Sequence, residues 1–176
     1  LTVEPTSNLA SQFERGGLDI LITTDEINAE RVCSMPLAPL ELGWFTSETL
    51  ARSLPKRPLE IHDIAHLPLI TFTRRSRPYL STLELFNSRD LQPPVLHSVT
   101  SLAAIVRLTE RGLGVATLPC GFDMGKGTLV RLDLDARLPD LPLYCLWHKT
   151  SDADLYGAIS ALAASCAEAH LVLPPV

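Results

Sequence analysis

Long apolar runs and a cysteine framework are both missing from this sequence. No run reaches the roughly 18–20 apolar residues of a membrane-spanning helix. The opening LTVEPTS has neither the basic nor the apolar region of a secretion signal, so we expect no membrane association. The four cysteines, which show no CxxC and no regular spacing, are Cys33, Cys120, Cys145 and Cys166. This pattern argues against a disulfide framework and favours a reducing, cytoplasmic location.

The sequence also lacks an excess of basic residues and any recognisable set of catalytic residues. The formal net charge is −5, so we do not expect these residues themselves to bind nucleic acid, which requires a basic face. No Ser–His–Asp or paired-carboxylate arrangement follows from the spacing, so we predict no enzyme and no catalytic residues. His62, Asp63 and His66 form HDxxH, but zinc requires a third protein ligand. We interpret HDxxH as a polar loop and predict no metal and no cofactor. We interpret Cys120 as a buried, inert thiol and not as a redox sensor.

What remains is the pattern of an α/β protein. Hydrophobic residues make up 46% and charged residues 20% of the chain, which suits one ordinary domain or two small lobes. Short apolar runs alternate with helical patterns, and this alternation indicates a mostly parallel α/β fold. The expected strands include residues 18–22, 40–45, 69–72, 95–98, 115–118 and 143–147. In the last helix, Leu155, Ile159, Leu162 and Cys166 share one face.

Residues 98–119, SVTSLAAIVRLTERGLGVATLP, are the most informative stretch. They predict a strand end, a helix with Thr100 as N-cap, a turn at Gly112 and Gly114, and a second strand, which together make a parallel βαβ unit. Hydroxyls and free helix N–H groups would meet at the start of the helix, a place that suits a small anion. The alternative is an ordinary structural loop with a cap. Strand, polar loop and helix recur in the same order at residues 69–86.

The order and spacing of several segments resemble the effector-binding domain of LysR-type transcriptional regulators. The segments are GGLDILIT, LELGWFTS, LPLITFTRRS, VTSLAAIVRLTERGLGVATLP and LYCLWHK, and the most specific is GLGVATLP at residues 112–119. The resemblance implies two Rossmann-like lobes of a periplasmic-binding-protein-like (type 2) fold, joined by two crossover strands. Lobe I would comprise residues 1–45 and 148–176, without the first strand and helix found in the family, and lobe II residues 46–147.

The resemblance also implies a function. The chain would be the effector-sensing and oligomerising domain of a transcriptional regulator, which binds a small co-inducer, expected to be an anion such as a carboxylate, in the cleft between the lobes. It would contact promoter DNA only through an N-terminal winged helix-turn-helix absent from this chain, and would form a homodimer or homotetramer. The alternative is a solute-binding protein of a transport system with the same architecture.

The candidate effector-binding residues follow the ends of predicted strands. Within TFTRRS, Thr73 and Ser76 would donate hydrogen bonds to a carboxylate, and Arg74 would add positive charge beside Arg75 and Arg77. The alternative for these residues is a solvated basic loop. For Thr23 and Thr24, which follow the predicted strand at residues 18–22, the alternative is ordinary turn chemistry. The complete set is Thr23, Thr24, Thr73, Arg74, Ser76, Ser98, Thr100 and Ser101.

Overall fold

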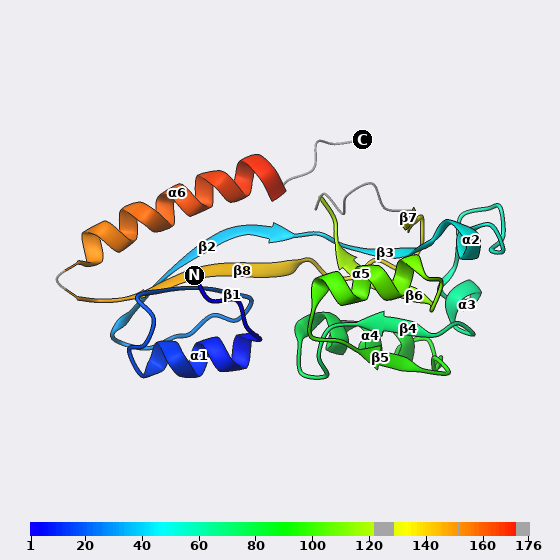
Figure 1. The fold of residues 1–176 in the computed structure, drawn as a ribbon, viewed down its shortest axis with the longest axis horizontal. Helices are drawn as coiled ribbons and strands as arrows, with labels where there is room; N and C mark the ends of the chain where they lie inside the picture. Colours follow the sequence, from blue (N-terminus) through cyan, green and yellow to red (C-terminus); the bar gives the residue numbers. More distant parts are fainter. Residues whose placement is uncertain (122–128, 151, 172–176) are drawn as a thin grey trace. The chain divides into compact units, whose positions relative to one another are not determined.

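The structure is a computed structural model that describes residues 1–121, 129–150 and 152–171. The chain separates into two compact units (Figure 1), one formed by Leu1–Leu40 with Leu141–Val176 and the other by Glu41–Asp140. It therefore passes from the first unit to the second once and returns once. Both junctions fall a few residues before the lobe boundaries expected at 45/46 and 147/148.

The first unit contains a three-stranded sheet in the order β1-β8-β2. Its strands are β1 (Ile20–Thr23), β2 (Val32–Leu40) and β8 (Leu141–His148), and β8 runs antiparallel to both neighbours. Helices α1 (Thr6–Glu14) and α6 (Ala153–Leu171) lie on opposite faces of these strands (Figure 1). Phe13, Leu21 and Leu146 form the buried cluster under α1.

Helix α6 turns its small residues toward the sheet and its large apolar residues toward solvent. Ser160 is fully buried, with its Oγ 3.2 Å from Cys145 Sγ. Leu155, Ile159 and Leu162, on the face noted in the sequence, are 59%, 43% and 67% exposed. Periodicity locates an apolar face on a helix but does not say what that face packs against.

The second unit is built on a five-stranded sheet in the order β5-β4-β6-β3-β7. Strand β4 is parallel to β5 and β6, whereas β3 is antiparallel to β6 and β7. The α/β fold class is confirmed, but the expectation of mostly parallel sheets is wrong. Both strand pairings in the first unit are antiparallel, and only the second sheet is mixed, because β3 runs against its neighbours there. The bounds are β3 (Leu42–Ser47), β4 (Leu69–Thr71), β5 (Leu96–Ser98), β6 (Val115–Pro119) and β7 (Leu129–Leu132).

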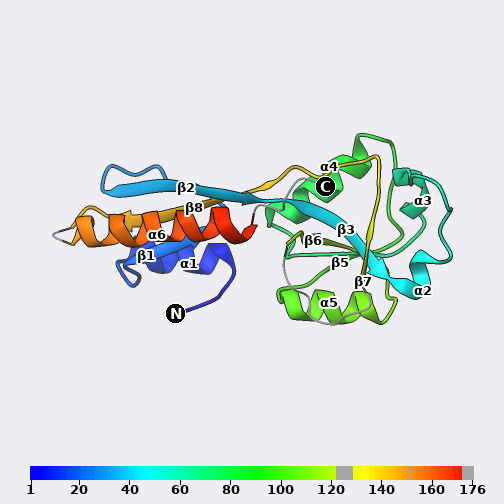
Figure 2. The same ribbon diagram turned by 90° about the horizontal axis from the view of Figure 1, so that it is seen from above.

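Two helices cover this second sheet, one on each side. Helices α4 (Arg77–Asn87) and α5 (Leu102–Glu110) lie on opposite faces of the strands (Figure 2). The short helices α2 (Glu48–Ala51) and α3 (Ile61–Ile64) follow β3 and precede β4. Ile70, Ile105 and Ala116 are fully buried between β4, α5 and β6.

The predicted βαβ unit runs through β5, α5 and β6, with β4 lying between its two strands. Gly112 ends α5 with a φ of +75°, the left-handed conformation that glycine adopts without strain. Gly114 allows the backbone of β6 to approach β4, because a Cβ there would lie 2.0 Å from the carbonyl oxygen of Pro68. That same carbonyl accepts a 3.0 Å hydrogen bond from Val115 N–H. Gly112 thus ends α5, and Gly114 lets the central strand β6 approach β4 closely.

Candidate ligand-binding site

The topology of the second unit singles out one edge of its sheet. Strands β4, β5 and β6 are parallel, so their carboxyl ends lie at the same edge. The chain leaves β4 through α4 toward β5 and returns through α5 to β6 on the other side of β4. The strand order therefore reverses beside β4, and open α/β sheets bind ligands where it does so. All the predicted site residues except Thr23 and Thr24 lie at this edge, Ser98 as the last residue of β5 and the others in the segments that follow β4 or β5.

The loop after β4 carries a helix cap and unneutralised positive charge. Ser76 is the N-cap of α4, and its Oγ accepts a 3.4 Å hydrogen bond from Tyr79 N–H. The carbonyl of half-buried Thr73 accepts a 2.8 Å bond from Ser76 N–H. Arg74 and Arg75 are exposed, and neither forms a salt bridge within the part of the chain that the structure describes. Their charge therefore adds to the positive end of α4.

The loop after β5 also leads into a helix N-terminus, but its cap is not the predicted one. The prediction of Thr100 as N-cap is wrong: Ser101 holds that position, and its Oγ accepts a 3.4 Å bond from Ala104 N–H. Either hydroxyl could serve from the sequence. Ser101 has the extended backbone of an N-cap, with a φ of −107° and a ψ of 123°. The Ser98, Thr100 and Ser101 side chains are exposed at this edge.

Two threonines below these loops were not predicted as part of the site. Thr71 and Thr117 are 0% and 1% exposed, and their Oγ1 atoms lie 2.6 Å apart in a hydrogen bond between β4 and β6. The bond ties the last residue of β4, from which one site loop departs, to the middle of β6. The sequence did contain a signal for this pair, because a threonine stands inside each of two apolar strands, LITF and VATL. A buried hydroxyl requires a hydrogen-bond partner, so the two threonines could have been expected to pair.

Thr23 and Thr24 lie in the first unit, at the carboxyl end of β1. Thr23 is 4% exposed, and its Oγ1 accepts a 3.3 Å hydrogen bond from Asp25 N–H. That is the turn chemistry named above as the alternative. Thr24 is half-buried.

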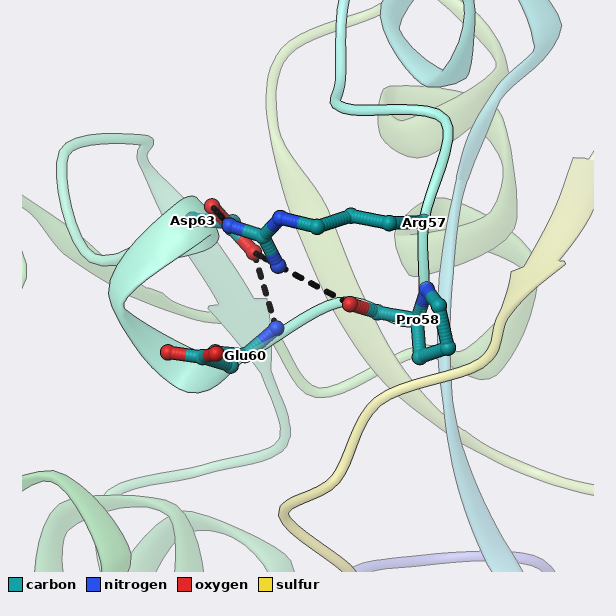
Figure 3. A network of polar contacts seen from close by, with 4 residues as sticks. All are labelled: Arg57, Pro58, Glu60 and Asp63. Atoms are coloured by element: carbon teal, nitrogen blue, oxygen red, sulfur yellow. Dashed lines mark hydrogen bonds and ion pairs between the residues drawn. The ribbon is translucent and has the colours of Figure 1, made fainter.

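Asp63, the aspartate of the HDxxH segment, takes part in a network of polar contacts (Figure 3). Both guanidinium nitrogens of Arg57 donate to the Asp63 carboxylate, Nη1 at 3.0 Å and Nη2 at 2.9 Å. The same carboxylate accepts a 2.8 Å bond from Glu60 N–H and completes a capping box at the start of α3. This backbone bond, helped by Arg57, lowers the pKa of Asp63. Among residues 1–121, 129–150 and 152–171, no group of three His, Cys, Asp or Glu side chains could hold a metal ion.

Cys120 is buried at the end of β6, and burial raises the pKa of its thiol. A protonated thiol is a poor nucleophile, so this environment does not favour redox sensing. No helix within the described ranges is both long enough and apolar enough to cross a membrane.

Comparison with known proteins places this geometry in a family. The model of the LysR substrate binding domain matches residues 1–170. The effector binding domain of QuiR, solved in complex with shikimate, superposes with a TM-score of 0.74 at 18% identity, over 95% of this chain and 80% of that one. The regulatory domain of CcmR from Synechocystis PCC6803, solved in complex with 2-PG, gives 0.68 at 16% identity, over 88% and 79%.

A longer regulator shows how much of such a protein this chain spans. HinK, a LysR family transcriptional regulator from Pseudomonas aeruginosa, gives a TM-score of 0.68 at 16% identity, over 89% of this chain and 56% of HinK. This chain therefore spans little more than half of that regulator. No curated protein sequence matches the chain significantly. Since the family model spans nearly all of the sequence, the chain belongs to the LysR substrate binding domain family.

Proposed function

We propose that this chain senses a small anionic effector for a LysR-type transcriptional regulator, binding it where β4 and β5 end. The observation that carries the proposal is the pair of serine-capped helix N-termini at this edge, beside Arg74 and Arg75, which form no salt bridge with any residue that the structure describes. Helix N-termini and guanidinium groups both favour an anion over a neutral or cationic ligand. QuiR and CcmR, which have the same fold, were solved in complex with shikimate and 2-PG, and these complexes support a small-molecule ligand here.

The regulatory step in this proposal is a shift between two arrangements of the protein. An effector changes the balance only by its differential affinity for the two arrangements. DNA would be contacted by a winged helix-turn-helix outside these residues, in keeping with the acidic charge of −5. The chain would bind its effector without transforming it and would act in the cytoplasm. The family match favours this role over that of a transport-type solute-binding protein.

The test is a thermal-shift screen of metabolite carboxylates and phosphates, with shikimate and 2-PG included, followed by calorimetry on the strongest binder. A ligand present at about 100 times its Kd adds about 2.7 kcal/mol to the stability of the protein. We expect Thr73→Val to weaken binding about tenfold, the loss of one hydrogen bond to a charged group. Stability should stay unchanged, because the Thr73 side chain caps no helix.

Two matched variants separate binding from folding. Ser101→Ala should weaken binding and also cost about 0.5–1 kcal/mol of stability, because it removes the cap of α5. Arg89→Gln removes an exposed arginine just beyond the C-terminal end of α4, away from the site, and should change neither quantity. If Thr73→Val binds the effector as tightly as the wild type does, the site lies elsewhere.

We further propose that the domain forms a homodimer, or a homotetramer built from such dimers. In the family, a helix of one lobe packs against the other lobe of the partner, which here would pair α4 with the region of α1. Leu80 on α4 is 52% exposed, whereas Phe13 on α1 is fully buried and unavailable for contact. Light scattering should report a dimer that Leu80→Glu weakens. A monomer at tens of micromolar would contradict this assembly.

A further inference from the structure

A cavity lies wholly within the first unit. It has a volume of about 390 Å³ and is bounded by the end of α1, the segment before β1, the end of β8 and the start of α6. This volume is within the range of about 300–1,000 Å³ that is usual for small-molecule sites. The polar side chains that line it are Glu14, Arg15, Asp19, His148, Thr150 and Tyr156.

Part of the cavity wall is held rigidly by the imidazole of His148. This ring stacks on Phe13, with 4.1 Å between centroids and 13° between planes. Its Nε2 lies 2.8 Å from the carbonyl oxygen of Phe13. Because a carbonyl can only accept, Nε2 carries the proton of this hydrogen bond. Gly16, with a φ of +73°, then turns the chain out of α1 at the cavity. This part of the wall is therefore fixed before any ligand arrives.

Charges of both signs line the cavity without neutralising one another. Within the described residues, neither Glu14 nor Arg15 forms a salt bridge. The Asp19 carboxylate accepts a single long hydrogen bond, 3.4 Å from the hydroxyl of Tyr156. Burial and the neighbouring carboxylates of Asp19 and Asp152 raise the pKa of Tyr156, so its hydroxyl remains a donor. One guanidinium and two carboxylates thus remain available to a ligand.

We propose that this cavity binds a free amino acid. The ammonium group would be recognised by Asp19 and Glu14, next to the carbonyl end of α1, whose partial charge is negative. The carboxylate would be recognised by Arg15 and the hydroxyl of Thr150. A simple anion would face two carboxylates and a negative helix end, and a simple amine would leave Arg15 without a partner. This site is independent of the anion site proposed in the second unit. Its two carboxylates and the negative helix end would favour a positively charged group, whereas the site in the second unit would favour a negatively charged one.

The experiment is amide chemical-shift mapping on the 176-residue chain with each of the twenty amino acids. We expect at least one of them, at about 10 mM or below, to shift the amides of Gly16 and Gly17. The amine and the carboxylic acid derived from the strongest binder, each of which lacks one charged group, should bind at least about tenfold more weakly. If no amino acid shifts these amides, or if the acid alone binds as well as the amino acid, the proposal is wrong.

Surface variants complete the test. Asp19→Asn and Arg15→Gln should each weaken binding of the amino acid about tenfold, while Asp133→Asn and Arg89→Gln, exposed positions of the second unit, should not. All four positions are exposed, so the melting temperature should stay close to that of the wild type. Thr73→Val must leave this binding unchanged. Weakening by Thr73→Val would place the amino acid in the second unit and overturn the proposal, whereas failure of the anion site alone would leave it standing.

Discussion

The hydrogen bond between Thr71 and Thr117 predicts a strong energetic coupling between two residues separated by 46 positions in the sequence. Their Oγ1 atoms lie 2.6 Å apart, and the two residues are 0% and 1% exposed. Valine has nearly the shape of threonine, so Thr71→Val removes one hydroxyl and creates little cavity. The remaining hydroxyl loses its protein partner in a site that water does not reach.

The magnitude follows from this geometry. A buried polar group left without its partner costs about 1–3 kcal/mol, whereas replacement of both partners by apolar groups of the same shape is nearly neutral. We therefore expect each single valine variant to lose about 1–3 kcal/mol in the free energy of unfolding. The double variant should be no less stable than either single one, so the coupling energy should be at least as large as the larger single loss, about 1–3 kcal/mol or more.

Urea unfolding of the four proteins, followed by far-UV circular dichroism, measures this coupling. A matched control is Thr109→Val, whose buried hydroxyl donates to the carbonyl of Ile105 within α5 instead of to either strand. Its effect should add to that of Thr71→Val. If the two strand substitutions are simply additive, the hydroxyls do not pair, and our account of how the end of β4 is held against β6 fails.

Two further predictions concern the backbone and pH. Gly114→Ala should cost more than about 3 kcal/mol, because the new Cβ would lie 2.0 Å from the Pro68 carbonyl oxygen. Gly16→Ala, strained only by its φ of +73°, should cost about 1–2 kcal/mol, and equal losses in urea unfolding would contradict the argument. The pKa of Asp63 is lowered in the folded state by the N–H of Glu60 and by Arg57, so ionised Asp63 stabilises the fold above about pH 4. This contribution is lost as the pH falls through the lowered folded pKa, and thermal melts should therefore show a shallower acid dependence for Asp63→Asn; parallel pH curves would refute this assignment.

The order of the elements and the character of the loops were determined by the sequence. Apolar alternation, prolines and glycines placed the strands and helices close to where they lie, since these signals act over only a few residues. The turn at Gly112 is an example, because its φ of +75° is a local requirement. The same local signals located the polar loops that follow β4 and β5, and hence the edge at which we place the effector.

Only the tertiary structure decided between the alternatives that those local signals left open. Thr100 and Ser101 are equally good caps in isolation, and the structure has Ser101 at the cap. Leu155, Ile159 and Leu162 mark a face of α6, but close packing of its small residues on the sheet turns that face outward. The Thr71–Thr117 bond joins separate strands, and the cavity beside His148 joins four segments from both ends of the chain. Pairing across such separations depends on strand register and helix rotation, which burial of the whole core fixes and which no short stretch of sequence encodes.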